Sequence, residues 1–461
     1  MAINLSRNTK VYFTTNVNAT TGAITDAASG FTNANTFEIA VQDGYSLSQN
    51  TGQQTIQISE AGETPSRGQR AFNTQLDPVD FSFSTYIRPQ TVSTFVTAAE
   101  KVLWNALLGA GAYDDAGAAV TSLTRATTAT ATATLATTAT LVIGQVVNVN
   151  GAAPASWNQA AVVAAIPSAG TYTVTFSKAP LAAAGTTATV TSAKAYTGQW
   201  AKGAGYSYVS TMGSNKNQLQ KFGMIFVIDQ ALYAVDNCAM DQVSVDFGLD
   251  AISMAAWSGK GTVLKKLSTL TGSHLVSNSL VAPTDANYIT NKLSTMSLAS
   301  NIGGSQHTTA ASTAYSIPIT GGNITIANNL NYLVPTNLGV VNLPIGYYTG
   351  QRAISGNVTA YLRTGGSNDS GALLQSLLTG ATTTTEPKYA VQLEMGGVAN
   401  SVKVEFDMSG VVLQIPAIDV ADIVSTTINF TAQGYNPDVI GNQTFEITND
   451  NDLTVRYYSP A

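Results

Sequence analysis

Carboxylate pairs come closest to a catalytic arrangement in this sequence. Asp114 stands beside Asp115, and Asp241 is near Asp246. Two neighbouring carboxyl groups could act as general acid and general base. In a β-rich chain such residues are more typical of turns and of solvated faces, where they bond to the backbone or to water. We therefore expect these pairs to be structural, and we expect the protein not to be an enzyme.

Two glycine-rich stretches could in principle bind phosphate. Gly259-Lys260-Gly261-Thr262 lacks the Gly-x-x-x-x-Gly-Lys-Thr/Ser spacing of a phosphate-binding loop. Gly109-Ala110-Gly111 follows a helical pattern instead of preceding one, which is typical of a helix C-terminus. Neither stretch predicts a nucleotide site, and we expect no cofactor.

Metal-binding and redox residues are scarce. Cys238 is the lone cysteine, which leaves no internal disulfide, and His274 and His307 have no Cys or His neighbour with which to form a zinc site. Only 10% of the residues are charged and the net charge is −6, which argues against a protein that grips nucleic acid phosphates. It does not argue against one that lets nucleic acid slide past. We expect neither a secretory leader nor a membrane span, because no apolar run is suitable.

An unusual group of charges lies between Ser59 and Arg70. Glu60, Glu63, Arg67 and Arg70 occur there among Gly and Pro residues, in a predicted loop between strands. Because the planar guanidinium group of Arg binds carboxylates well, the loop suits docking to another copy of the chain, with Arg67 or Arg70 bridging to a carboxylate of the neighbour. An ordinary solvated loop is the equally open alternative.

The elements that would hold these residues are mostly strands, and their pattern occurs twice. The matched runs are 8–13 with 290–293, 37–44 with 315–322, 83–88 with 358–363, and 256–259 with 431–434. In the second and third matches the apolar residues fall on the same face of the strand. A slip of one residue would reverse the faces, so the agreement in parity indicates a duplication. The runs 37–44 and 315–322 each end in a turn pair and predict the first arm of a hairpin.

A helix is expected after the third matched run in each half. Apolar residues follow helical spacing from Val92 to Leu107, and again from Leu373 to Leu378 before Gly380. The offset between the halves then falls from 275 to 175, so the first half carries 275 − 175 = 100 extra residues. The segment 117–196, rich in Ala, Thr and Val, predicts a β module inserted in a surface loop, with 171–176 as one of its strands.

The predicted organisation is therefore mainly β with one repeated domain. The segments are 1–116 (first domain, N-terminal part), 117–196 (inserted module), 197–264 (first domain, C-terminal part), 265–284 (linker), 285–436 (second domain) and 437–461 (C-terminal β extension).

Several segments resemble a known family. The segments 41–44, 59–68 and 81–89 are similar to the N-terminal tube domain of tail tube proteins of long-tailed bacteriophages, and 246–247 with 256–259 to the closing strands of that domain. The segments 317–322 and 358–362 look like the second tube domain of the duplicated siphophage type. The insertion looks like the small β or Ig-like modules that decorate phage structural proteins.

The resemblance implies a structural virion protein. Each tube domain would be a β-sandwich or β-barrel with a flanking helix, and six such domains would form a ring, so three copies of this chain would make a pseudo-hexameric homotrimer. Stacked rings would form the conduit for genome ejection in the phage tail, assembled in the bacterial cytoplasm. Its partners would be other copies of the chain, the tape measure, terminator and baseplate proteins, and double-stranded DNA that passes without specific binding.

Elementary physics favours the same interpretation. Strands joined edge to edge leave no exposed edge, and head-to-tail contacts close into rings when the rotation permits. A weakly acidic lumen would repel phosphates. The alternatives are a baseplate hub or tail terminator ring with the same fold, and, from another class, a carbohydrate-binding or depolymerising virion surface protein.

Overall fold

The computed structural model describes most of the chain. The described residues are 9–25, 30–32, 35–42, 44–56, 70–92, 95–108, 118–125, 132–138, 146–150, 152–153, 157, 160–176, 187–191, 194–196, 200–201, 206–209, 219–229, 231–249, 251–267, 288–300, 314–366, 368–383, 389–396, 402–419, 423–433 and 453–458.

Seven strands of the first half form two sheets that share one long strand. The strands are β1 (Thr9–Thr14), β2 (Thr36–Ile39), β3 (Ser46–Ile56), β4 (Arg70–Tyr86), β15 (Phe222–Ile228), β16 (Ala231–Gly248) and β17 (Met254–Gly261). One sheet has the order β2–β1–β15–β16 and uses the N-terminal part of β16. The other has the order β3–β4–β17–β16 and uses its C-terminal part.

The second half repeats this order of pairing. Its strands are β19 (Thr295–Ser300), β20 (Ala314–Ile317), β21 (Ile319–Ala327), β24 (Ala353–Tyr361), β25 (Tyr389–Gly396), β26 (Lys403–Leu413), β27 (Ala417–Asp419) and β28 (Ser425–Gln433). The orders are β20–β19–β25–β26 and β21–β24–β28–β26, with β27 continuing the edge of β26 along β28. Together β26 and β27 therefore occupy the place of the long strand β16.

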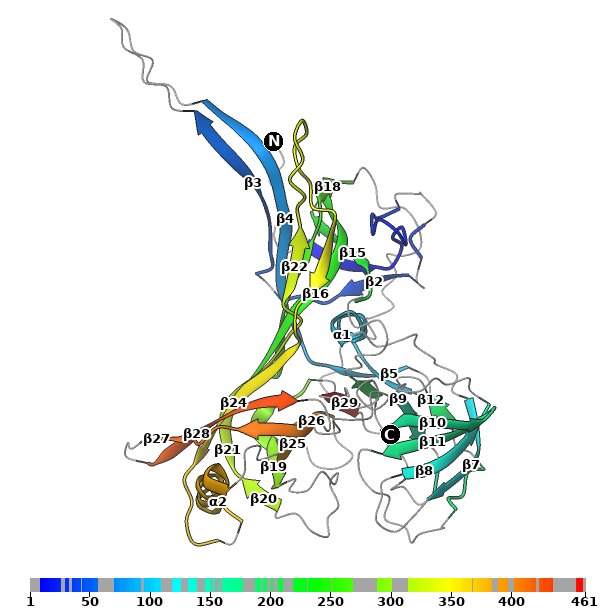
Figure 1. Ribbon diagram of the computed structural model, residues 1–461, viewed down its shortest axis with the longest axis vertical. Coiled ribbons are helices and arrows are strands. Elements are labelled where there is room, and N and C mark those ends of the chain that lie inside the picture. The colour runs from blue at the N-terminus through cyan, green and yellow to red at the C-terminus, as the bar shows by residue number, and fades with distance from the viewer. Residues whose placement is uncertain are drawn as a thin grey trace, which may run out of the picture.

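One sheet continues without interruption from the first half into the second. The C-terminal part of β16 pairs with β21 in antiparallel register, with residues 242–248 opposite residues 327–321. The result is a single sheet in the order β3–β4–β17–β16–β21–β24–β28–β27. In Figure 1, β16 runs through the middle of the molecule and connects its upper and lower parts.

The glycine pair at the start of β21 lies inside this junction. Gly321 and Gly322 pair with Gly248 and Phe247, so the turn predicted at this pair is wrong. A side chain at Gly322 would place its Cβ 2.2 Å from the carbonyl oxygen of Asn357, on the neighbouring strand. Glycine is therefore present here because β24 approaches closely, not because the chain reverses. The hairpin prediction for 37–44 also fails, since β2 pairs with β1.

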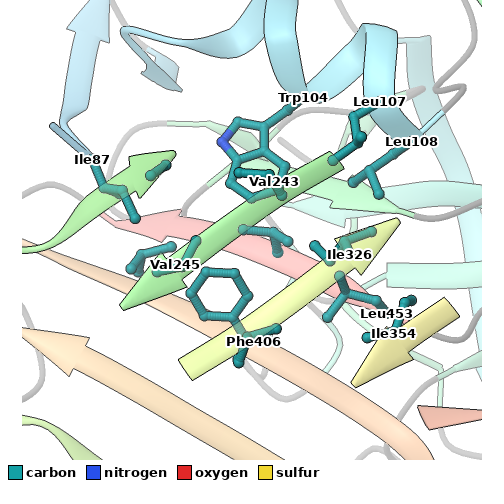
Figure 2. Close-up of a cluster of buried hydrophobic side chains, with 14 of the residues drawn as sticks. Ile87, Trp104, Leu107, Leu108, Val243, Val245, Ile326, Ile354, Phe406 and Leu453 are labelled. Atoms are coloured by element: carbon teal, nitrogen blue, oxygen red, sulfur yellow. The ribbon is translucent and has the colours of Figure 1, made fainter. Parts of the chain in front are cut away.

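The main hydrophobic core lies on one face of the continuous sheet and draws side chains from both halves. Figure 2 shows Val243 and Val245 of β16 near Ile326 of β21 and Ile354 of β24, with Trp104 above them and Phe406 below. All six side chains are buried. Alternate residues of these strands face the core, as the period-2 pattern predicts.

Two α-helices occur among the described residues, α1 (Lys101–Leu108) and α2 (Ser370–Thr383). The second was predicted correctly, although it continues past Gly380. The first is shorter than expected, because the N-terminal part of the predicted helix forms a hairpin of β5 (Pro89–Val92) and β6 (Phe95–Ala98). This segment is rich in Val, Thr and Phe, which favour strands.

Strand pairing also corrects the alignment of the halves. Asn291–Leu293 is a 3-10 helix, η5, and not part of a strand. The last matched run is displaced by four residues, because Trp257 pairs with Phe83 while Ile428 pairs with the equivalent Val358. The true offset of these strands is therefore 428 − 257 = 171. A shift of four preserves parity, so the predicted faces survive the correction.

The inserted segment contains a separate closed barrel. Its strands are β7 (Ala118–Arg125), β8 (Thr132–Thr137), β9 (Val146–Asn150), β10 (Ala160–Ser168), β11 (Thr171–Phe176) and β12 (Lys194–Tyr196), in the order β10–β11–β8–β7–β12–β9. The strand predicted at 171–176 is thus confirmed. The barrel has its own core, around Leu135, Trp157 and Val174. A closed barrel differs from the two separate sheets of an Ig sandwich.

The other strands in the described ranges are short. They are β13 (Trp200–Ala201), β14 (Tyr206–Val209), β18 (Leu264–Lys266), β22 (Leu330–Leu333), β23 (Gly346–Thr349) and β29 (Thr454–Tyr458). Within the described ranges, neither helix is long and apolar enough to cross a membrane.

Candidate assembly surface

The continuous sheet presents one face that the main core does not cover, called here the polar face. Its side chains alternate with the buried ones, and most are short hydroxyl and amide groups, partly or fully exposed; Met254 and Tyr361 are exposed exceptions. The short polar side chains include Ser46, Ser48, Ser82, Ser84, Ser244, Ser258, Asn323, Thr325, Ser355, Asn357, Thr359, Thr427, Asn429 and Thr431. The face is therefore polar but mostly uncharged.

Charged groups are sparse along this face. Asp80 and Lys260 oppose one another on β4 and β17, with 4.0 Å between their charged atoms. Asp246 is exposed and lies opposite Asn323, and Asp419 is exposed on β27. Asp241, by contrast, accepts a hydrogen bond of 2.7 Å from the backbone N–H of Leu330.

The two outermost strands of the sheet leave an edge uncovered in the described structure. β3 pairs only with β4, and β27 only with β28, among the strands described. Exposed apolar side chains follow the β27 edge, with Ile415, Ile418 and Ile423 all about half exposed or more. Uncovered edges with apolar side chains are places where another chain can pair.

The internal junction shows what would cover such an edge. Strand pairing makes Ile418 the equivalent of Val245, and Leu47 the equivalent of Ile324. Val245 has no exposed surface because β21 lies beside it, whereas Ile418 is 48% exposed. The difference in exposure thus follows from the presence or absence of a neighbouring strand.

The predicted charged loop connects β3 to β4 in the chain, and these two strands form a long arm. Glu60, Glu63 and Arg67 lie in the segment 57–69, outside the described residues. Arg70 is exposed, opens β4 and pairs with Ile56 across the arm. In Figure 1 the ends of β3 and β4 project at the upper left, beside the hairpin of β22 and β23.

A second protrusion was missed by sequence reasoning. This protrusion is the hairpin of β22 and β23. The segment at its end, called here the apolar tip, exposes Leu338, Val340, Val341, Leu343 and Ile345. It lies against the arm, since the backbone N–H of Leu76 donates a 2.8 Å hydrogen bond to the carbonyl oxygen of Asn342. In the sequence, the apolar run 338–345 is interrupted by Gly and Pro, and this combination indicates an exposed loop more than a core strand.

A buried acid lies at the start of α1, away from the polar face. Tyr457 donates a hydrogen bond to Glu100, and the indole N–H of Trp104 donates one of 2.7 Å to the Tyr457 hydroxyl. Burial raises the pKa of Glu100 to about 7, although the hydrogen bond from Tyr457 and the nearby charge of Arg88 oppose this rise. Burial and the charge of Glu100 raise the pKa of Tyr457.

The remaining sequence candidates do not assemble into a chemical site. Cys238 is buried, where desolvation raises the pKa of its thiol. Asp114, Asp115, His274 and His307 lie outside the described residues. Within the part of the chain that the structure covers, no group of three or more His, Cys, Asp or Glu side chains could hold a metal ion.

Comparison with known proteins gives one informative relationship. No family model matches the chain. The chain is 24% identical over 440 residues to "Tail tube protein pb6" of Escherichia phage T5, a match that covers 94% of this chain and 73% of that protein. This relationship confirms the resemblance to siphophage tail tube proteins and supports a structural role in the tail. It does not favour a hub, a terminator or a carbohydrate-binding protein.

Proposed function

We propose that this chain is a structural subunit of a siphophage tail tube and a component of the virion, and that its continuous sheet forms the wall of the tube. The observation that carries this proposal is the β16–β21 junction, where two repeated units already join edge to edge within one chain. We infer no catalytic activity for the subunit.

The repeated pairing order supports a division into two tube domains. The first comprises 1–116 and 197–264, the second 285–436, with 265–284 as the linker between them and 437–461 as a C-terminal extension. The inserted module, 117–196, interrupts the first domain after α1. Its separate core supports the view that it is an independent unit.

Ring closure would repeat the internal junction between chains. The edge of β27 in one copy would pair with β3 of the next, in the register that the duplication dictates. Ala417, Ile418 and Asp419 would then lie opposite Ser48, Leu47 and Ser46 of the neighbouring copy, as Ser244, Val245 and Asp246 lie opposite Thr325, Ile324 and Asn323. Three chains would supply six tube domains and close a pseudo-hexameric ring.

The polar face would line the lumen. Serine, threonine and asparagine side chains offer DNA neither a cluster of cations nor a large apolar surface, so phosphates would find no strong binding site. Few of the acidic side chains that give the chain its negative charge would lie on this face. Asp246 and Asp419 occupy equivalent positions, which would place one carboxylate per tube domain on the wall.

Stacking of rings would use the projecting arms. The apolar tip exposes five aliphatic side chains within eight residues, so it suits contact with the next ring. The charged segment with Glu60, Glu63, Arg67 and Arg70 would be carried on the neighbouring arm. Tape measure, terminator and baseplate proteins remain proposed partners at the ends of the tube.

Disulfide trapping tests the proposed register. Ala417→Cys combined with Ser48→Cys should cross-link neighbouring copies in purified tubes, giving species up to a trimer on a non-reducing gel. Cys238 is buried and gives little background. As the matched control, Ala417→Cys with Ser46→Cys is displaced by two residues and should cross-link much less. Equal yields from both pairs, or none from either, would refute the register.

A further inference from the structure

The C-terminal strand β29 lies between the two halves of the molecule. On one side it pairs with β26 of the second half, with Val404 opposite Tyr457 and Phe406 opposite Val455. On the other side it pairs with β14, which precedes β15 of the first half, with Tyr206 opposite Tyr457. A strand of only five residues thus bonds to both halves at once.

The side chains of this strand enter the shared core. Leu453, Val455 and Tyr457 alternate along the chain and have no exposed surface. Figure 2 shows Leu453 in the same cluster as Ile326 and Ile354 of the second half and Leu107 and Leu108 of α1. The Tyr457 hydroxyl accepts the hydrogen bond from Trp104 and donates the one to Glu100, both at α1.

Among the described residues, the first half has only a short strand in the equivalent position. This strand, β18, pairs with the N-terminal part of β16 and follows β17 almost directly in the chain. β18 contains only Leu264, Lys265 and Lys266, none of them buried. The second half is therefore completed by a segment from the far end of the chain that also reaches the first half.

We propose that β26, β14 and α1 together bind an extended segment with alternating apolar residues, whose last buried tyrosine contacts α1, and that the chain's own strand β29 occupies this position as a latch. The latch holds the second half at a fixed angle to the first, in addition to the β16–β21 junction. This inference rests on the proposed function, because the angle between the halves decides whether the sheet can close into a ring.

A substitution that displaces β29 in the full-length chain tests the latch. In Val455→Asp, a charge enters a fully buried position, so hydrogen exchange should accelerate at least tenfold in 404–406 and 206–209 while 243–246 stays protected. The concentration needed for tube formation should rise at least tenfold. Ile166→Asp, on the exterior of the inserted barrel, is the matched control and should change neither quantity.

If the Val455→Asp chain unfolds completely, a disulfide cross-link to β29 tests the latch instead. Ser207 and Arg456 are directly paired, so Ser207→Cys with Arg456→Cys should form a disulfide within one chain, run as a monomer, slow exchange in β29 and still permit tubes. Dimeric bands would overturn a latch within one chain, as would wild-type tube formation by a folded Val455→Asp. Failure of the wild-type chain to form any tubes would instead refute the proposed function.

Discussion

Replacing Ile418 with Asp tests the ring-closing contact at a single side chain. Ile418 is 48% exposed on β27, while its equivalent Val245 is fully covered by β21. If β3 of a neighbouring copy covers the β27 edge in the same way, the exposed half of Ile418 becomes buried during assembly. The substitution should therefore weaken assembly more than it destabilises the isolated chain.

The size of the effect follows from this exposed fraction. Full burial of an isoleucine contributes about 1.5–3 kcal/mol, so burial of the remaining half contributes about 1 kcal/mol. Burying a polar group without a partner costs about a further 2 kcal/mol. The sum of about 3 kcal/mol corresponds to roughly a 100-fold increase in the dissociation constant of each contact between chains.

Sedimentation and negative-stain electron microscopy would measure the concentration at which tubes form. Thermal unfolding of the unassembled Ile418→Asp chain should change much less than assembly does, because about half of the side chain is exposed before assembly. Ile166→Asp introduces the same charge at a comparably exposed site on the inserted barrel and should assemble normally. Tube formation by Ile418→Asp at the wild-type concentration would show that the β27 edge is not the contact.

Four further outcomes are expected. The pKa of Glu100 in the folded chain, about 7, lies above its value in the unfolded chain. The contribution of Glu100 to stability is therefore complete below about pH 4.5 and is lost as the pH rises through 7. Glu100→Gln should remove about 3 kcal/mol of this pH dependence, as measured by denaturant unfolding at several pH values. Leu338→Asp should leave rings that do not stack, which electron microscopy would reveal as single rings in place of tubes. Replacing 117–196 by a short Gly/Ser bridge should still permit tubes, and the loss of tubes from a folded variant would contradict this. Charge reversal at both Arg67 and Arg70 should impair assembly of a folded monomer, whereas normal tubes would show that their loop is only solvated.

Sequence periodicity predicted the faces of the strands better than it predicted the elements themselves. The burial of Phe83, Trp257 and Ile317 follows from a two-residue alternation that depends only on backbone geometry. The segment 92–100 was misread because short apolar runs satisfy helical and strand periods equally well. The Gly321–Gly322 pair was misread because glycine serves turns and close approaches alike, and only the neighbouring strand β24 distinguishes the two.

The assembly edges could not have been found from the sequence, for a physical reason. An edge strand and an internal strand of one sheet have the same alternation, since both bury one face, and they differ only in the strand that lies beside them. Val245 and Ile418 illustrate this: both are β-branched, both precede an aspartate, and both point to the core side of the sheet. The structure separates them because one has a neighbouring strand and the other does not.

The duplication carries the inference further, because the internal junction specifies the residues that should meet at the open edge. The two halves differ, by contrast, in their projecting arms and at β29, features outside the wall. A fused pair of domains can therefore keep a nearly sixfold wall while presenting its projections only three times per ring.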